Sequence, residues 1–338
     1  MRGARNRERG RLFWLLAMLL LVAGCERGQP PLYIGANIWP GYEFLFLADQ
    51  LGFYAEEGAN VRMVEFLSLG DSRRAFERGQ VDLFAATPVE VLVASEQSAR
   101  EVRVFYATSI SLGPDVIMAA PQIGSVAELR GRRVAIEPGT LDILLLYAAL
   151  AQSGLTLDDV VLVPMAQAHM PQALQEGLVD AVAVYPPESI EIEQSVAGCA
   201  EVTHRCVLFD SGQVPGLIID MLVTDRAVVE QRGGDLAAVA RAFDRAVAWA
   251  LEYPQQAHAL MAQRQGLSAD DFVRKLAGLR ILRLDEQARW LVAGNGVYRS
   301  LEQAAYALGS TGVLLKPVET EPLLTTVAVP GALPSPVR

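Results

Sequence analysis

The sequence predicts an α/β fold built from two lobes of similar plan, and a repeated corner is the first sign of it. An apolar strand pattern at residues 32–35 is followed by Pro40-Gly41 and then by an apolar helical pattern at 44–48. Ninety-eight positions later, Pro138-Gly139 again separates an apolar strand pattern, at 134–136, from an apolar helical run. Each segment therefore predicts a strand that turns directly into a helix, the unit of α/β sheets.

A second pair of segments matches at the same offset. Gly79-Gln80-Val81-Asp82 parallels Gly177-Leu178-Val179-Asp180, and each is typical of a helix ended by glycine before a buried strand. Two such units in one register predict two βαβαβ lobes. Ligands of open α/β sheets bind outside the carboxyl ends of the strands, where helix N–H groups are free. The two lobes are therefore expected to face each other across a cleft with helix N-termini on both walls.

The first 24 residues are predicted to be an export signal. Five arginines precede an apolar run of thirteen residues, 12–24, which is short for a membrane span and suits a signal peptide. The run ends in Leu21-Val22-Ala23-Gly24-Cys25, which resembles the bacterial lipobox and predicts lipidation at Cys25. Residues 25–31 would then be a lipidated tether to the membrane. The alternative is an uncleaved anchor helix, and in both cases the body lies outside the cytoplasm.

Two further cysteines remain once Cys25 is assigned to lipid. Cys199 and Cys206 form an even pair, seven positions apart, in a compartment that favours oxidation. They predict a local disulfide, and the alternative is two buried thiols.

The charge balance bears on the kind of partner. Residues 25–338 carry 24 basic and 38 acidic side chains, a formal net charge of −14, with no basic cluster. This composition argues against a nucleic-acid partner. About 314 residues suit two lobes better than one small domain, and the chain is expected to be a monomer.

Aromatic and polar side chains are concentrated where the predicted strands end. Trp39 and Tyr42, beside the first Pro-Gly corner, can stack on a ligand and also hydrogen-bond, although the same rings could be core or lid packing. The predicted ligand-binding residues are Trp39, Tyr42, Ser68, Thr87, Ser111, Asp115, Glu137, Gly139, Thr140, Gln167, Tyr185 and Asp220. The strand-end loops hold several carboxylates and no Lys or Arg, so a purely polyanionic ligand is disfavoured. A small solute with an aromatic or amine part, zwitterions included, is expected.

Two extended segments are candidates for the connection between lobes. The strand predicted at 103–109 continues through 109–115 into the apolar run 116–119, and the apolar segment 215–224 would return. Asp220 is a lone charge inside that return, and a buried carboxylate needs partners. It is expected either to be satisfied by backbone at the hinge or to face the cleft. The rest of the chain is predicted helical, and residues 317–338 are predicted to be a disordered tail.

Catalytic patterns are few. The three histidines, His169, His204 and His258, are scattered, and there is no Gly-x-Ser-x-Gly or phosphate-loop motif. No cysteine is left over as a nucleophile. We therefore expect a binding protein rather than an enzyme, with no cofactor and no metal.

Five short motifs form a characteristic set: Trp39-Pro40-Gly41-Tyr42, Phe66-x-Ser68 with Gly79-x-Val81-Asp82, Ser111-x-Gly113-x-Asp115, Leu129-Arg130-Gly131-x-Arg133-Val134-Ala135, and Gly216-x-Ile218-x-Asp220-x-Leu222-Val223. Taken together, they resemble the ABC-transporter solute-binding proteins of the nitrate/sulfonate/taurine type, related to the thiamine-precursor group. The resemblance covers about residues 31–300. The chain departs from the aromatic-Glu-Pro turn of many relatives, because Tyr185-Pro186-Pro187 displaces Glu188 by one position.

The resemblance implies a type II periplasmic binding protein that closes on its ligand by a two-crossing hinge. It implies lobe I from residues 32–112 and 220–316, and lobe II from 113–219. Its partners would be a small-molecule ligand, an ABC permease with its ATPase, and a membrane reached through the lipid. It also implies that most of the strand-end residues named above lie in the cleft. Two alternatives stay open on the same fold: a ligand-sensing partner of a membrane signalling protein, and an enzyme of the thiamine-precursor type.

Overall fold

The computed structural model describes residues 29–199 and 206–331. The predicted export signal and Cys25 lie outside the described residues, so their assignment stays a prediction. From Leu32 onward the chain forms one compact unit. Within the described residues, none of the helices is both long and apolar enough to cross a membrane.

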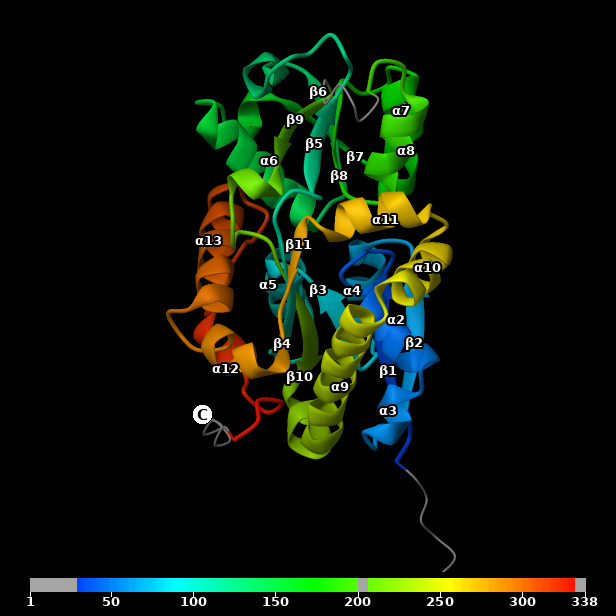
Figure 1. The fold of residues 1–338 in the computed structure, drawn as a ribbon. Helices are drawn as coiled ribbons and strands as arrows, with labels where there is room; N and C mark the ends of the chain where they lie inside the picture. The colour runs from blue at the N-terminus through cyan, green and yellow to red at the C-terminus, as the bar shows by residue number, and fades with distance from the viewer. Residues whose placement is uncertain (1–28, 200–205, 332–338) are drawn as a thin grey trace, which may run out of the picture. The chain divides into compact units, whose positions relative to one another are not determined.

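A six-stranded mixed sheet forms the first lobe, at the lower part of Figure 1. Strand β1 is flanked in parallel by β2 and β3, and β10 pairs antiparallel with β3 and β4. The strand order is β11-β4-β10-β3-β1-β2. The strands are β1 (Leu32–Asn37), β2 (Val61–Phe66), β3 (Leu83–Ala86), β4 (Val102–Ser111), β10 (Ile219–Asp225) and β11 (Leu279–Ile281).

A five-stranded sheet forms the second lobe, at the upper part of Figure 1. Strand β6 lies between β7 and β8, both parallel to it, and β5 pairs antiparallel with β8 and β9. The strand order is β7-β6-β8-β5-β9. The strands are β5 (Val116–Ala119), β6 (Arg133–Ile136), β7 (Val161–Pro164), β8 (Ala181–Val184) and β9 (Val207–Asp210). The predicted two-lobed α/β fold is confirmed.

The chain passes between the two sheets twice, between β4 and β5 and between β9 and β10. The two crossings are hydrogen-bonded to each other. The Ser111 N–H donates to the Ile218 carbonyl at 3.1 Å, and the Ser211 N–H donates to the Asp115 carbonyl at 2.9 Å. The Ser211 hydroxyl also accepts the Gly113 N–H at 2.7 Å. These bonds make the crossings a paired connector between the lobes.

The repeated Gly-x-Val-Asp segments have the same structural role in both lobes. Gly79 and Gly177 end helices with φ of 70° and 68°, a conformation that glycine adopts without strain. The aspartate that follows accepts a backbone N–H from the neighbouring strand: Asp82 from Tyr33 at 2.8 Å, and Asp180 from Arg133 at 2.9 Å. The aspartate therefore ties the start of the third strand of each unit to the start of its first strand.

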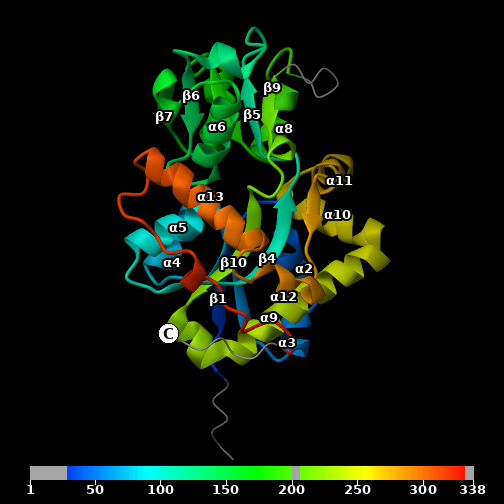
Figure 2. The same ribbon diagram turned by 90° about the vertical axis from the view of Figure 1, so that its left-hand side faces the viewer.

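Helices pack on both sheets, with apolar side chains turned inward. In the first lobe, α9 packs on α2, and α13 packs on α5 and also contacts α6 of the second lobe (Figure 2). The helices are α2 (Glu43–Gln50), α3 (Phe53–Glu56), α4 (Leu69–Glu77), α5 (Pro88–Gln97), α6 (Leu141–Gln152), α7 (Met170–Gln175), α8 (Glu188–Ser195), α9 (Arg226–Glu252), α10 (Pro254–Gln265), α11 (Ala269–Leu276), α12 (Gln287–Trp290) and α13 (Gly296–Ser310). A disulfide joins Cys199 and Cys206.

The predicted disordered tail at 317–338 is wrong for residues 317–331. Leu324 forms a bridge with Val104 of β4, and the Thr325 N–H donates to the Val104 carbonyl at 3.0 Å. Leu323, Ala328 and Val329 are buried. Spaced apolar residues that dock on the edge of a packed sheet order the segment, which its Pro- and Thr-rich composition did not reveal. Residues 332–338 lie outside the described residues.

Candidate functional site

The predicted site residues lie where strands of both sheets end and helices begin. Trp39 and Tyr42 follow β1, Ser68 follows β2, and Thr87 follows β3. On the second sheet, residues 137–140 follow β6, Gln167 follows β7 and Tyr185 follows β8. All of these are buried except Gly139, which is half-buried, and Pro138, which is exposed.

Asp220 on β10 joins several of these residues in one cluster. Its carboxylate accepts hydrogen bonds from Trp39 Nε1 at 3.1 Å, Tyr42 OH at 2.9 Å and Ser109 Oγ at 2.5 Å. Burial raises the pKa of Asp220 to about 6, although these three donors hold it down. Of the two expectations for this lone charge, the structure shows it satisfied, but by side chains rather than by backbone: two from the segment that follows β1 and one from β4.

Three contacts join the two lobes across the strand ends. Ser68 Oγ donates to Glu137 Oε1 at 2.6 Å. The N–H of Leu141, the first residue of α6, donates to Glu90 Oε1 of α5 at 3.0 Å. The rings of Trp39 and Tyr185 meet edge to face, with centroids 5.9 Å apart. In this structure the two walls are therefore in contact.

Thr87, Thr140 and Ser111 have partners that explain their burial without a ligand. Thr87 donates its N–H and its hydroxyl to Glu90 Oε2, at 2.8 and 2.5 Å, and so caps α5. Thr140 Oγ1 donates to the Glu137 carbonyl at 2.8 Å. Ser111 Oγ lies 2.7 Å from Ser211 Oγ in the crossings. These three residues shape the cleft, and a ligand role for them stays a prediction.

Four residues of the site were not among the predicted ligand-binding residues. Glu90 links the starts of α5 and α6, and Asp142 accepts the Glu137 N–H at 2.8 Å and Gln167 Nε2 at 2.7 Å. Arg74 Nη2 lies 3.9 Å from Glu137 Oε1, and Arg73 packs beside Gly139. Both arginines lie inside α4. They are therefore not part of the strand-end loops, which contain no Lys or Arg.

Buried polar atoms without a hydrogen bond are concentrated among these residues. Within the described parts of the chain, neither carboxylate oxygen of the fully buried Asp115 forms a hydrogen bond of normal geometry, although the nearby Ser111 hydroxyl lowers the pKa of this carboxyl. Four further atoms of the predicted site and its neighbour Asp142 also have no hydrogen bond: Glu137 Oε2, Asp142 Oδ1, Gln167 Oε1 and Tyr185 OH. An unpaired buried polar atom costs on the order of 1–3 kcal/mol, so a cluster of them marks a place where a ligand or water is expected.

The carboxylates of the site are held toward their neutral forms. Burial raises the pKa of Asp115 to about 8 and those of Glu137 and Glu188 to about 7. Burial also raises the pKa of Asp142 and of Glu90. The negative charges of neighbouring carboxylates add to the effect of burial at Asp115, Glu137 and Asp142. These buried carboxylates thus form a desolvated acidic cluster.

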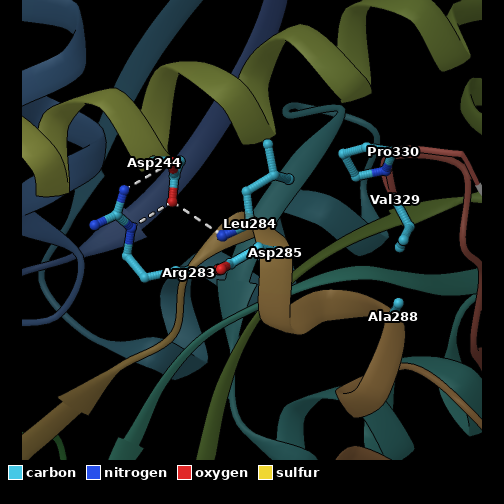
Figure 3. A pocket seen from close by; sticks show the side chains of 7 residues that line it. All are labelled: Asp244, Arg283, Leu284, Asp285, Ala288, Val329 and Pro330. Atoms are coloured by element: carbon cyan, nitrogen blue, oxygen red, sulfur yellow. Dashed lines mark hydrogen bonds and ion pairs between the residues drawn. The ribbon is translucent and has the colours of Figure 1, made fainter.

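A second concave region lies away from the strand ends. Figure 3 shows a pocket of about 530 Å³ lined by Asp244, Arg283, Leu284, Asp285, Ala288, Val329 and Pro330. Arg283 pairs with Asp244 at 2.6 Å, and the Leu284 N–H donates to the same carboxylate at 2.9 Å. The main charged groups of this pocket already satisfy each other, so the interlobe cluster is the stronger candidate site. Among the described residues, no group of three or more His, Cys, Asp or Glu could hold a metal ion.

The fold is that of periplasmic binding proteins, as solved structures show. The alkanesulfonate-binding protein SsuA of Xanthomonas axonopodis pv. citri, bound to MOPS, superposes with a TM-score of 0.72 at 20% identity, covering 87% of this chain and 97% of that one. The periplasmic aliphatic sulphonate binding protein SsuA of Escherichia coli gives 0.70 at 22% identity, covering 91% and 94%. At these identities the likeness shows the fold.

Sequence comparison identifies the family. Residues 39–257 match the NMT1/THI5-like family, and the chain belongs to it. A Brucella abortus protein named for a binding role is 23% identical over 206 residues, which are 60% of this chain and 63% of that protein. The chain thus spans less than two thirds of that relative's length. The family resemblance predicted from the motifs is confirmed, and these relatives are named as binding proteins rather than enzymes.

Proposed function

We propose that this protein is the solute-binding component of an ABC importer, which captures a small organic solute between its two lobes. The observation that carries the proposal is the group of buried, unpaired polar atoms beside contacts that join the strand ends of both sheets. Family membership and the shared fold support the same function. The partners would be the solute, a permease and its ATPase.

The mechanism is closure of the two lobes about the paired crossings at 112–115 and 211–218. In an open state, the Ser68–Glu137 and Glu90–Leu141 bonds would be replaced by bonds to water, and a solute could enter. Closure restores these bonds and buries the solute. A solute that binds the closed state better shifts the population toward it, and this is the form a permease would recognise.

The chemistry of the cleft favours a solute that bears an amine or an aromatic group, zwitterions included. Trp39 and Tyr185 offer ring faces and edges, and the unpaired carboxylate oxygens accept hydrogen bonds. Sulfonates and thiamine-precursor-like pyrimidines belong in the screen because of the family. The roles of Trp39, Tyr42, Ser68, Thr87, Ser111, Asp115, Glu137, Gly139, Thr140, Gln167, Tyr185 and Asp220 as ligand-binding residues are part of the proposal.

Location follows from the predicted N-terminal features. With a signal at residues 1–24 and lipidation at Cys25, the body would sit on the extracytoplasmic side, held to a membrane by several acyl chains. Labelling with a radioactive fatty acid, lost in Cys25→Ala, would test the anchor.

A thermal-shift screen of the purified protein against amines, pyrimidines, sulfonates and small carboxylates tests the function. The expected result is a raised Tm with one chemical class, because a ligand that binds only the folded state stabilises it. The ligand should then be recovered unchanged after long incubation, as a carrier requires. Conversion of the ligand to a product would contradict a carrier and favour an enzyme on this fold.

A further inference from the structure

Three of the helix starts at the strand ends, those of α4, α5 and α6, are already occupied by the protein's own carboxylates. Glu137 lies against the start of α4, where it accepts the Ser68 hydroxyl and where a Cβ on Gly70 would come within 2.6 Å of Glu137 Oε1. Glu90 serves two helices, since it accepts the Thr87 N–H of α5 and the Leu141 N–H of α6. Helix N-termini attract anions. An anionic solute would have to compete with these carboxylates, and so an anion site is not what the cleft offers.

In the described part of the site, Asp115 is an acidic group that lacks a counter-ion. Asp115 lies in the first crossing, fully buried, with no hydrogen bond to its carboxylate within the described residues. The charges that act most strongly on it are Asp220 on β10 and Glu90 on α5, and Asp142 on α6 is coupled to it as well. Tyr42, ahead of α2, also lies in the field of Asp115. All of these groups are neutral or negative, so no counter-ion for Asp115 is found among them.

Other residues of the site supply further hydrogen-bond acceptors and an aromatic ring that could contact a cation. Asp142 Oδ1, Glu137 Oε2 and Gln167 Oε1 are buried acceptors without donors. The Tyr185 ring packs edge to face on Trp39, and ring faces attract cations when both are desolvated. Arg73 Nε, beside Gly139, is a buried donor without a partner in the described chain, but the unpaired acceptors named here and at Asp115 outnumber it. A bound group that carries positive charge and N–H or C–H donors would complement these acceptors.

We propose that the solute is an organic cation, an amine, amidine or quaternary ammonium compound, and that Asp115 is its counter-ion. This inference rests on the proposed function, since it names the solute class of the same cleft. The proposed solute differs in charge from the sulfonates for which the proteins of similar fold are named.

Binding of a cation should release a proton. In the empty protein, burial and the charges of Asp220 and Glu90 raise the pKa of Asp115 to about 8, so the carboxyl is mostly protonated at neutral pH. A cation binds the ionised form better and expels the proton. For one coupled group, the affinity should rise by about tenfold per pH unit up to about pH 8 and then level off.

The experiment is isothermal titration calorimetry of the full-length protein with probes matched in skeleton and opposite in charge. Benzyltrimethylammonium is paired with phenylmethanesulfonate, within a panel of other amines, amidines and their sulfonate or carboxylate counterparts. A quaternary ammonium keeps its charge at every pH, so any pH dependence belongs to the protein. The expected result is binding of cations only, with the affinity rising between pH 6 and pH 8 and with a proton released, measured in buffers of different ionisation enthalpy.

Asp115→Asn and Asp158→Asn form the variant and its control. Asp158 is exposed on the second lobe, so its substitution removes the same charge away from the cleft. Asp115→Asn should weaken cation binding by about tenfold or more and reduce the pH dependence, whereas Asp158→Asn should change neither. Proton release is measured on the unaltered protein. The inference can therefore be tested even if Asp115→Asn fails to fold.

The outcomes separate this inference from the proposed function. Binding of sulfonates or carboxylates without the cations, unaffected or improved by Asp115→Asn, would overturn the cation inference and leave a solute-binding cleft in place. Cation binding that is independent of pH and of Asp115 would overturn the role of that residue. Failure of every compound in both charge classes to bind would count against the solute-binding function itself.

Discussion

The hydroxyl of Tyr185 offers a test of whether this residue binds the solute or only packs against its neighbours. Its ring packs on Trp39, and its buried hydroxyl has no partner within the described residues. Tyr185→Phe should therefore leave stability unchanged or raise it by up to about 1 kcal/mol, because an unpaired buried hydroxyl is removed. If the hydroxyl binds the solute, the affinity should fall by about fivefold to tenfold. Urea unfolding and a binding titration measure the two effects.

Tyr54→Phe is the matched control. The Tyr54 hydroxyl is also buried but donates to the Leu45 carbonyl at 3.0 Å inside the first lobe. Its loss should cost about 1 kcal/mol of stability and leave affinity as it was. A Tyr185→Phe protein that loses stability but not affinity would show that Tyr185 is packing alone.

Single residues of the site were predictable to different degrees. Trp39, Tyr42 and Tyr185 could be placed because they follow recognisable strand ends, and the lone charge of Asp220 was expected to need partners. Glu90 and Asp142 lie in the first turns of α5 and α6. Glu90 makes a contact between the lobes, and Asp142 joins the loops after two strands of the second lobe, and no local pattern encodes either contact. The same is true of Arg73 and Arg74, whose place near Glu137 and Gly139 depends on how the lobes pack.

At the scale of elements, helices α8 and α11 form a charged contact between the lobes. Glu193 of α8 accepts Lys275 Nζ at 2.8 Å and Arg274 Nη1 at 3.0 Å, both from α11. If the lobes separate on opening, this contact exists in the closed state only. Glu193→Gln should then lower solute affinity by about threefold to fivefold, consistent with about 1 kcal/mol for a partly exposed ion pair. Titrations at low and high salt check it, since salt should reduce the difference between the two proteins.

Glu230→Gln is the control for that contact. Glu230 pairs with Arg226 at 2.7 Å within α9, so its loss removes an ion pair that does not join the lobes. Its affinity should match that of the unaltered protein. Equal losses of affinity in the two variants would show that the α8–α11 contact does not contribute specifically to closure.

The elements themselves were the most predictable level. Both Pro-Gly corners, and the strands that follow both Val-Asp pairs, are present, because apolar periodicity and helix-ending glycines act locally. The docking of the segment around Leu324 on Val104 was missed, since a lone bridge to a distant strand leaves no periodic signal.

At the scale of the whole molecule, the buried acids predict how the stability of the empty protein changes with pH. Burial raises the pKa of Asp115 to about 8, of Glu137 and Glu188 to about 7, and of Asp220 to about 6. In the unfolded chain such groups titrate near about 4. Between pH 5 and pH 8 the folded protein therefore holds more protons than the unfolded chain, so its free energy of unfolding should fall as pH rises.

Acid should destabilise the protein through the carboxylates whose pKa values are lowered in the folded state. Arg133 lowers the pKa of Asp180, and the Ser268 hydroxyl and Arg274 lower that of Asp271, so both contribute stability that is lost as pH falls below about 4. Maximal stability of the empty protein is thus expected near pH 5, measured as the urea midpoint across pH 3 to 9. Asp115→Asn should flatten the decline between pH 5 and pH 8, because one of the protonated groups is gone, and a bound cation should flatten it as well. A urea midpoint that stays level or rises from pH 5 to pH 8 would mean that these carboxyls are ionised and paired in solution. The carboxyl groups of the site would then not form a desolvated acidic cluster.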